Sequence, residues 1–151
     1  MLDRYEQFSF MISVVNRQIQ KIERDEMIKY GYKGSFAQYL TVMRHHPEGV
    51  TAAQLSELCD RDKAAVSRVI TEMIEKGLVV RNAENDTLYR AKLVLTQEGE
   101  KIAEFVAKRA VAAVSAVGKE LSDNERKMFY ATLDFISTKL EAISKEGIPQ
   151  E

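Results

Sequence analysis

Two helix signals close together in the middle of the chain constrain its fold most. Thr51 and Gln54 form a T-x-x-Q pattern, in which each side chain can bond the backbone N–H of the other residue and so begin a helix. The turn CDRD follows this short helix, and Asp62 can cap a second helix over residues 63–76. Gly77 then stands where a helix commonly ends on a left-handed residue. Two helices joined by so tight a turn predict a helix-turn-helix.

The hydrophobic pattern changes after this pair of helices. Residues 78–81 and 89–95 are rich in Val, Leu and Tyr, and the polar sequence NAENDT lies between them. Apolar runs on either side of a turn sequence predict a β-hairpin. We therefore expect a mainly α fold, a winged helix-turn-helix with a two-stranded wing hairpin.

Long helices are predicted before this region. Apolar residues at three- and four-residue spacing indicate a helix over residues 3–28, and GYKG at residues 31–34 ends it. Ser35 with Gln38 predicts a capping box for a helix to about His46.

Two more helices are predicted after the hairpin. Thr96 is placed to cap a helix to about Gly118, and Ser122 with Glu125 predicts a capping box for a last helix to about Ser144. With no repeat or linker between them, all these elements form a single expected domain over residues 1–151.

Composition limits the class of protein. The chain has 151 residues, a net charge of -1, 45% hydrophobic residues and one cysteine, so we expect a globular protein without a disulfide framework. No apolar run approaches the roughly 18 residues that a membrane span needs, so no membrane partner is expected. The N-terminus lacks the features of a secretory signal, and cytoplasmic localisation is the default expectation.

The helix predicted over residues 63–76 has two contrasting faces. At about 100° per residue, one arc is apolar and the opposite arc combines small residues with hydrogen-bond donors. Leu55 and Leu58 of the preceding short helix are expected to face the core. A polar arc is by itself consistent with ordinary solvation, but next to a tight turn and a hairpin with cationic residues it favours DNA binding. The apolar arc holds Val66, Val69, Ile70 and Met73, and the polar arc holds Lys63, Ala64, Ser67, Arg68 and Thr71.

Four motifs together resemble the multiple-antibiotic-resistance regulator (MarR) family of bacterial transcription factors. They are VTAAQLSEL, DKAAVSRVI, EKGLV and RAKLVLT. The resemblance implies a homodimeric, sequence-specific regulator, most simply a repressor, that binds a pseudo-palindromic operator in double-stranded DNA. It also implies a winged helix-turn-helix over about residues 35–95 and dimerisation helices over about residues 3–30 and 97–144.

The resemblance also implies the DNA-contacting residues. A recognition helix would enter the major groove, the wing would lie near a minor groove, and the start of the short helix would lie near phosphates. The residues so assigned are Thr51, Gln54, Arg61, Lys63, Ala64, Ser67, Arg68, Thr71, Arg90 and Lys92. The wing departs from the usual Asp-x-Arg pattern, because Leu88 stands two residues before Arg90 and the nearest acid is Asp86.

The terminal helices supply an independent reason to expect a dimer. A winged helix-turn-helix cannot cover the apolar stripes predicted in the first helix and the last two helices. A monomer that folds these helices back as a bundle is the alternative on patterning alone.

Other functions have less support. By resemblance, a small aromatic or phenolic effector would bind in a cleft near Phe36, Tyr39, Met43 and Phe105, although such residues are also typical of plain core. Cys59 is interpreted as a packed thiol, with a redox-responsive regulator as the alternative. No metal, cofactor or catalytic residue is expected, because adjacent His45 and His46 lack helical ligand spacing and no nucleophile has a base. A winged-helix module that binds a protein partner is the remaining alternative.

Overall fold

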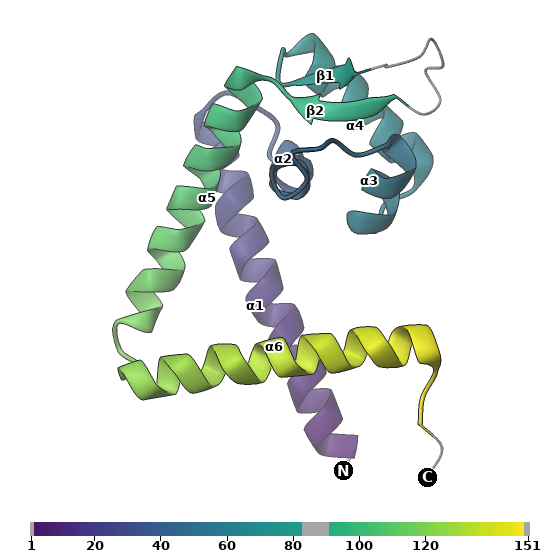
Figure 1. Ribbon diagram of the computed structural model, residues 1–151. Helices are drawn as coiled ribbons and strands as arrows, with labels where there is room; N and C mark the ends of the chain where they lie inside the picture. The colour runs from purple at the N-terminus through teal and green to yellow at the C-terminus, as the bar shows by residue number, and fades with distance from the viewer. Residues whose placement is uncertain (1, 83–90, 150–151) are drawn as a thin grey trace. The chain divides into compact units, whose positions relative to one another are not determined.

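The computed structural model describes residues 2–82 and 91–149 (Figure 1). Its order of helices and strands confirms the predicted fold class. The chain divides into two compact units, Met1–Val111 and Ala112–Glu151, and each is described by itself. The elements are α1 (Leu2–Lys29), α2 (Phe36–Arg44), α3 (Ala52–Leu58), α4 (Lys63–Glu75), β1 (Val79–Asn82), β2 (Lys92–Leu95), α5 (Gln97–Gly118) and α6 (Asp123–Glu146).

Several predicted caps begin helices as expected. Thr51 and Gln54 form the reciprocal capping box of α3. The carboxylate of Asp62 accepts a hydrogen bond of 2.9 Å from the Ala65 N–H at the start of α4. Ser122 and Glu125 form the capping box of α6. Each cap satisfies N–H groups that the helix itself leaves without partners.

The predicted capping box at Ser35 is wrong. Ser35 already has helical backbone angles and its side chain forms no capping hydrogen bond. The N–H groups of Phe36 and Ala37 donate instead to the carbonyl oxygens of Lys33 and Gly34, because a turn precedes α2. The side chain of Gln38 is turned to another partner, the carbonyl oxygen of Cys59, at 3.1 Å.

The sheet joins the wing to the helix-turn-helix. β1 and β2 pair antiparallel, with Val79 opposite Leu95 and Asn82 opposite Lys92. Val50, just before α3, forms a further bridge with Leu93 through two hydrogen bonds, of 3.1 and 2.8 Å. The chain on both sides of the helix pair is therefore held to one strand.

One apolar core fills the space among α2, α3, α4, the sheet and the first turns of α5. Leu55 is fully buried, as predicted, but Leu58 is 50% exposed and its predicted inward position is wrong. At 100° per residue the buried neighbour of Leu55 is Cys59, four residues on, and Leu58 lies to one side of that line. The largest core side chains are Phe36, Met27, Leu40, Leu55, Ile70, Met73, Leu78, Leu93 and Ile102.

A polar contact from α1 and a ring contact from Tyr30, the residue after it, join this part of the chain to α5 within the first unit. The carboxylate of Glu26, which is nearly buried, accepts from Arg109 Nε at 3.2 Å and from Lys29 Nζ at 2.6 Å. The hydrogen bond from Lys29, together with that from Arg109, lowers the pKa of Glu26 below its usual value. The rings of Tyr30 and Phe105 lie 4.4 Å apart, centre to centre.

The second unit contains the end of α5 and the whole of α6. Within α6, all of whose residues the structure describes, no side chain is buried. Over residues 2–82 and 91–149, no helix is both long and apolar enough to cross a membrane. The large side chains exposed on α6 are Met128, Phe129, Tyr130, Phe135 and Leu140.

Candidate nucleic-acid interface

The two faces predicted for α4 are present in the structure. Val66, Ile70 and Met73 are buried and Val69 is half-buried, so this arc holds the helix on the core. The opposite arc is exposed along its whole length, which confirms the predicted separation of apolar and polar faces. This exposed arc consists of Lys63, Ala64, Ser67, Arg68 and Thr71.

The side chains of the exposed arc of α4 have sizes and hydrogen-bonding groups that suit a groove of a nucleic acid. Ala64 and Ser67 are small, so the helix backbone can approach another surface closely between the two cations, Lys63 and Arg68. Thr71 donates its hydroxyl hydrogen to the Ser67 carbonyl oxygen at 3.0 Å. This bond leaves the Thr71 oxygen as an acceptor and fixes the side chain, so Thr71 offers a methyl group and a lone pair rather than a donor.

The turn before α4 is held by a dense set of hydrogen bonds. The Ser56 hydroxyl donates to the Arg61 carbonyl oxygen, and the Arg61 N–H donates back to the Ser56 carbonyl oxygen at 3.0 Å. Asp60, between them, has a φ of 49°, a left-handed conformation that Asp tolerates better than most residues. The Gln38 side chain binds the adjacent Cys59 carbonyl oxygen. These contacts fix the direction in which α4 leaves the turn.

Thr51 and Gln54 lie at the exposed start of α3, but their polar groups are engaged. Gln54 Oε1 accepts from the Thr51 N–H at 2.9 Å, and Thr51 Oγ1 accepts from the Gln54 N–H at 3.2 Å. Both residues therefore stabilise the first turn of α3. The amide NH₂ of Gln54 remains able to donate to a phosphate.

The wing carries its cations on β1 and β2. Lys92 is exposed at the first residue of β2. Arg90, assigned to the wing tip from the sequence, lies outside the described residues, as do Asp86 and Leu88. Arg81 on β1 is also exposed and was missed by sequence reasoning. Its position at the end of a short apolar run was the available signal.

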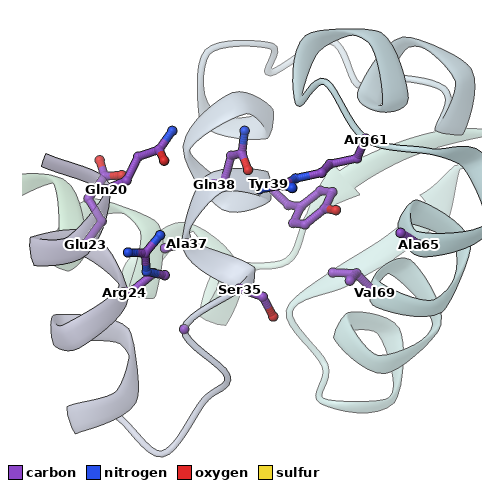
Figure 2. Close-up of a pocket in the computed structure, with 11 residues that line it drawn as sticks. Gln20, Glu23, Arg24, Ser35, Ala37, Gln38, Tyr39, Arg61, Ala65 and Val69 are labelled. Atoms are coloured by element: carbon purple, nitrogen blue, oxygen red, sulfur yellow. The ribbon is translucent and has the colours of Figure 1, made fainter. Parts of the chain in front are cut away.

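A cavity of about 300 Å³ lies between α1 and the helix-turn-helix (Figure 2). Glu23 and Arg24 of α1 line one side and Arg61 lines the other, with Tyr39 of α2 beside it. Of the four residues predicted for an effector cleft, Tyr39 lines this cavity. Phe36 and Met43 are buried in the core, and Phe105 packs against Tyr30. The full lining is Gln20, Glu23, Arg24, Gly34, Ser35, Ala37, Gln38, Tyr39, Arg61, Ala65 and Val69.

The cavity mixes charges of both signs. Burial raises the pKa of the Glu23 carboxyl above its ordinary value of 4.5. Burial also raises the pKa of the Tyr39 hydroxyl, which keeps it a neutral donor. Arg61 lines the cavity and also lies just before α4, in the turn that leads into the exposed arc.

Cys59 is a core group. Its side chain is buried, and desolvation raises the pKa of the thiol from 9.0 to about 11. A thiol with so high a pKa is almost entirely protonated near neutral pH, and the thiolate is the form that oxidants attack. The local chemistry therefore favours packing over redox reactivity.

Comparison with known proteins identifies the fold. Residues 30–87 match the sequence model of the MarR family, which confirms the resemblance seen in the motifs of the winged helix-turn-helix. A comparison with curated protein sequences finds no significant match.

Several solved structures share this architecture. A putative MarR-family regulator from Listeria monocytogenes, in complex with 26mer DNA, is 17% identical, with a TM-score of 0.71 over 93% of this chain and 95% of its own. MepR, a transcription regulator of the Staphylococcus aureus multidrug efflux pump MepA, is 18% identical, with a TM-score of 0.65 over 88% of this chain and 98% of its own. NadR in complex with 4-hydroxyphenylacetate is 16% identical, with a TM-score of 0.69 over 85% of this chain and 91% of its own. These likenesses establish the fold.

Proposed function

We propose that this chain is a homodimeric, sequence-specific repressor, because residues 30–87 match the sequence model of the MarR family. It binds a pseudo-palindromic operator through α4 and the wing, and a small aromatic or phenolic effector releases it. One observation carries the proposal. An exposed arc of cations and small residues runs along α4, on a helix whose other face is buried in the core.

Arg68 and Lys63 are the chief anchors in this proposal. Arg68 lies in the middle of the exposed arc, between Ala64 and Thr71, where a guanidinium can reach guanine edges or phosphates. Lys63 at the first turn of α4 suits a phosphate contact, since a helix N-terminus favours anions. Lys92 and Arg81 extend the cationic surface to the wing.

The exposed apolar residues support the homodimer. Phe8, Met11, Ile12 and Val15 of α1 are each at least 40% exposed, and α6 exposes Met128 and Phe129. Burying such a surface against a second copy removes apolar area from water, the dominant favourable term in association. A twofold dimer would present two copies of α4 to successive major grooves.

The cavity beside Arg61 and Tyr39 supports an effector site. Its size is at the lower end of the range for small-molecule pockets. A phenolic acid would place its carboxylate near Arg24 or Arg61 and its ring beside Tyr39 and Val69. This site replaces Phe36, Met43 and Phe105 as the proposed location, because those residues pack in the core or against Tyr30.

Arg68→Ala tests the function. In a gel-shift titration against an operator selected from random DNA, it should lower the affinity about 5- to 150-fold, since a good bidentate contact is worth about 1–3 kcal/mol. Lys76→Ala, which removes the same charge from the exposed end of α4, is the matched control and should stay within about twofold.

Salt dependence separates this function from binding of a protein partner. DNA affinity should fall steeply with salt, because phosphate contacts release counterions. Equal DNA affinity of Arg68→Ala and wild type at fixed salt would show that α4 does not bind the DNA. If the selection from random DNA shows no sequence preference for the wild-type protein, the proposed function is wrong and a protein-interaction module is favoured.

A further inference from the structure

The recognition helix ends in a rigid backbone motif. Gly77 has a φ of 71°. Its N–H donates to the Ile74 carbonyl oxygen, and the Leu78 N–H donates to the Met73 carbonyl oxygen, both at 2.9 Å. This pair of bonds is the Schellman arrangement, which fixes the path of the chain as it leaves a helix. The carbonyl groups of Gly77 and Leu78 then point away from α4 toward the start of α5.

Thr96 binds both of these carbonyl groups. Its hydroxyl donates to the Gly77 oxygen at 2.6 Å, and its backbone N–H donates to the Leu78 oxygen at 3.0 Å. The same hydroxyl oxygen accepts from the Gly99 N–H at 3.0 Å, which caps the first turn of α5. One side chain therefore joins the end of α4 to the beginning of α5.

Gly99 allows the first turn of α5 to touch the backbone of Leu78. A Cβ at this position would overlap the Leu78 carbonyl oxygen and lie 3.0 Å from the carbonyl carbon. Both are backbone atoms of a fully buried residue, so neither can move without displacing β1. Only glycine permits so close an approach of α5 to the Leu78 backbone, just before β1.

The part of α5 that lies in the first unit is itself held firmly. Ile102, Ala103 and Val106 are buried in the core, and Arg109 is bound to Glu26 of α1. The contacts of Thr96 and Gly99 with Gly77 and Leu78 therefore link the position of α5 directly to that of α4. We call the cluster of Gly77, Leu78, Thr96 and Gly99 the α4–α5 joint.

We propose that Thr96 and Gly99 are positioning residues that fix the angle of the recognition helix to α5. The proposal rests on the proposed function, because the angle matters when two copies of α4 must match two half-sites. A rigid joint makes the dimer selective for one half-site spacing. A loosened joint would let each α4 find its groove independently.

Two pairs of variants of the full chain test this idea. Thr96→Val keeps the shape but removes the hydroxyl bonds to Gly77 and Gly99, whereas Thr96→Ser keeps them. Gly99→Ala introduces the overlap with Leu78. Gly118→Ala, in the last position of the same helix, has no atom within 4 Å of the added Cβ and is the matched control.

The readout is affinity against half-site spacing. Duplexes carry two selected half-sites whose centres are separated by about 10 base pairs and are moved apart or together one base pair at a time. Wild type, Thr96→Ser and Gly118→Ala should lose about tenfold or more at the wrong spacing. Thr96→Val and Gly99→Ala should weaken at the best spacing and show less than about threefold preference, while binding to a single half-site stays within about twofold.

The outcomes separate the joint from a general loss of structure. An unchanged spacing profile in Thr96→Val overturns the proposal. An equal loss on single and double half-sites also overturns it, since that result signals unfolding rather than misplacement. If Gly99→Ala does not fold, Thr96→Val and Thr96→Ser still decide.

A second readout does not need DNA. If wild type shows no sequence preference, the proposed function fails, and hydrogen exchange at the backbone amide of residue 96 tests the joint alone. This amide binds the Leu78 oxygen through main-chain atoms that Thr96→Val leaves in place. Faster exchange in Thr96→Val than in Thr96→Ser supports the joint, and equal exchange overturns it.

Discussion

The winged-helix region and α6 use their apolar residues in opposite ways. In residues 36–95, the large apolar side chains described are mostly buried, and the exposed face of α4 is polar. In α6, Phe129, Phe135 and Leu140 are each more than half exposed, and no residue of that helix is buried. Both regions carry apolar residues at helical spacing, but those of the winged-helix region are buried within the first unit, whereas those of α6 are exposed.

This difference shows which part of the molecule can be stable alone. The winged-helix region completes its own core, so its stability depends on packing within one chain. A helix such as α6 gains most of its stability from burying an apolar face. In the proposed homodimer a second copy would cover this face, so we expect the stability of α6 to vary with protein concentration.

The largest expected effect is a loss of stability caused by a substitution in the core of the winged-helix region. Leu55→Ala should lower the free energy of unfolding by about 2–5 kcal/mol, because it leaves a cavity beside Cys59 in a fully buried site. Leu58→Ala, three residues along the same helix, should cost less than about 1 kcal/mol, since that side chain is half exposed. Urea denaturation of both variants at one protein concentration measures the difference. Equal losses would mean that Leu58 is covered in solution.

A second experiment addresses the exposed face of α6. Phe129→Glu with Leu140→Glu places two charges on one apolar stripe. The association constant of the proposed dimer should therefore fall at least about tenfold, as expected for charges without partners in an apolar interface. Sedimentation at several concentrations measures the association constant.

The matched control for the α6 experiment is Thr138→Glu, on the opposite side of the same helix. Similar weakening by Thr138→Glu would show that net charge, not loss of the stripe, drives dissociation. An unchanged association constant in the double variant would show that this face of α6 is not part of the dimer interface.

The smallest effect concerns two carboxylates of α1 that respond oppositely to pH. The pKa of Glu26 is lowered, so its contribution to stability is present above its unfolded value of 4.5 and is lost as pH falls through the folded value. The pKa of Glu23 is raised, so its contribution is greatest below 4.5 and is lost as pH rises through the folded value.

Melting curves of two glutamine variants check these signs. Relative to wild type, Glu26→Gln should melt lower near pH 7, and its deficit should shrink toward about pH 3. Glu23→Gln should melt slightly higher near pH 7, because it removes a charge that burial disfavours. A deficit of Glu26→Gln that persists unchanged at low pH would assign the loss to packing instead of to the ion pair with Arg109.

Much of the fold was predictable because its signals are local. A capping box such as that of Thr51 involves residues three apart, and the arcs of α4 follow from helical geometry alone. Ser35 carries the same sequence signal as Thr51, but there the neighbouring turn supplies the hydrogen bonds and Gln38 binds Cys59, a residue distant in sequence. Tertiary contacts decided between the two sites.

The candidate site was predictable only in part. The exposed arc of α4 followed from periodicity, whereas the cavity did not, because Glu23, Tyr39 and Arg61 come from three separate segments. The contact between Gly99 and Leu78 was equally inaccessible, since a glycine in a helix gives no sign of which backbone approaches it. Such features arise only when distant segments meet.

The pairing of Val50 with Leu93 also has a consequence for the order of folding. These residues enclose α3, α4 and β1, so the bridge closes a long loop whose entropic cost must be met before its two hydrogen bonds form. Local helix formation is faster than such non-local pairing. The helix pair should therefore assemble first and β2 last, so that a partly folded chain would already have α4 before Thr96 joins the end of that helix to α5.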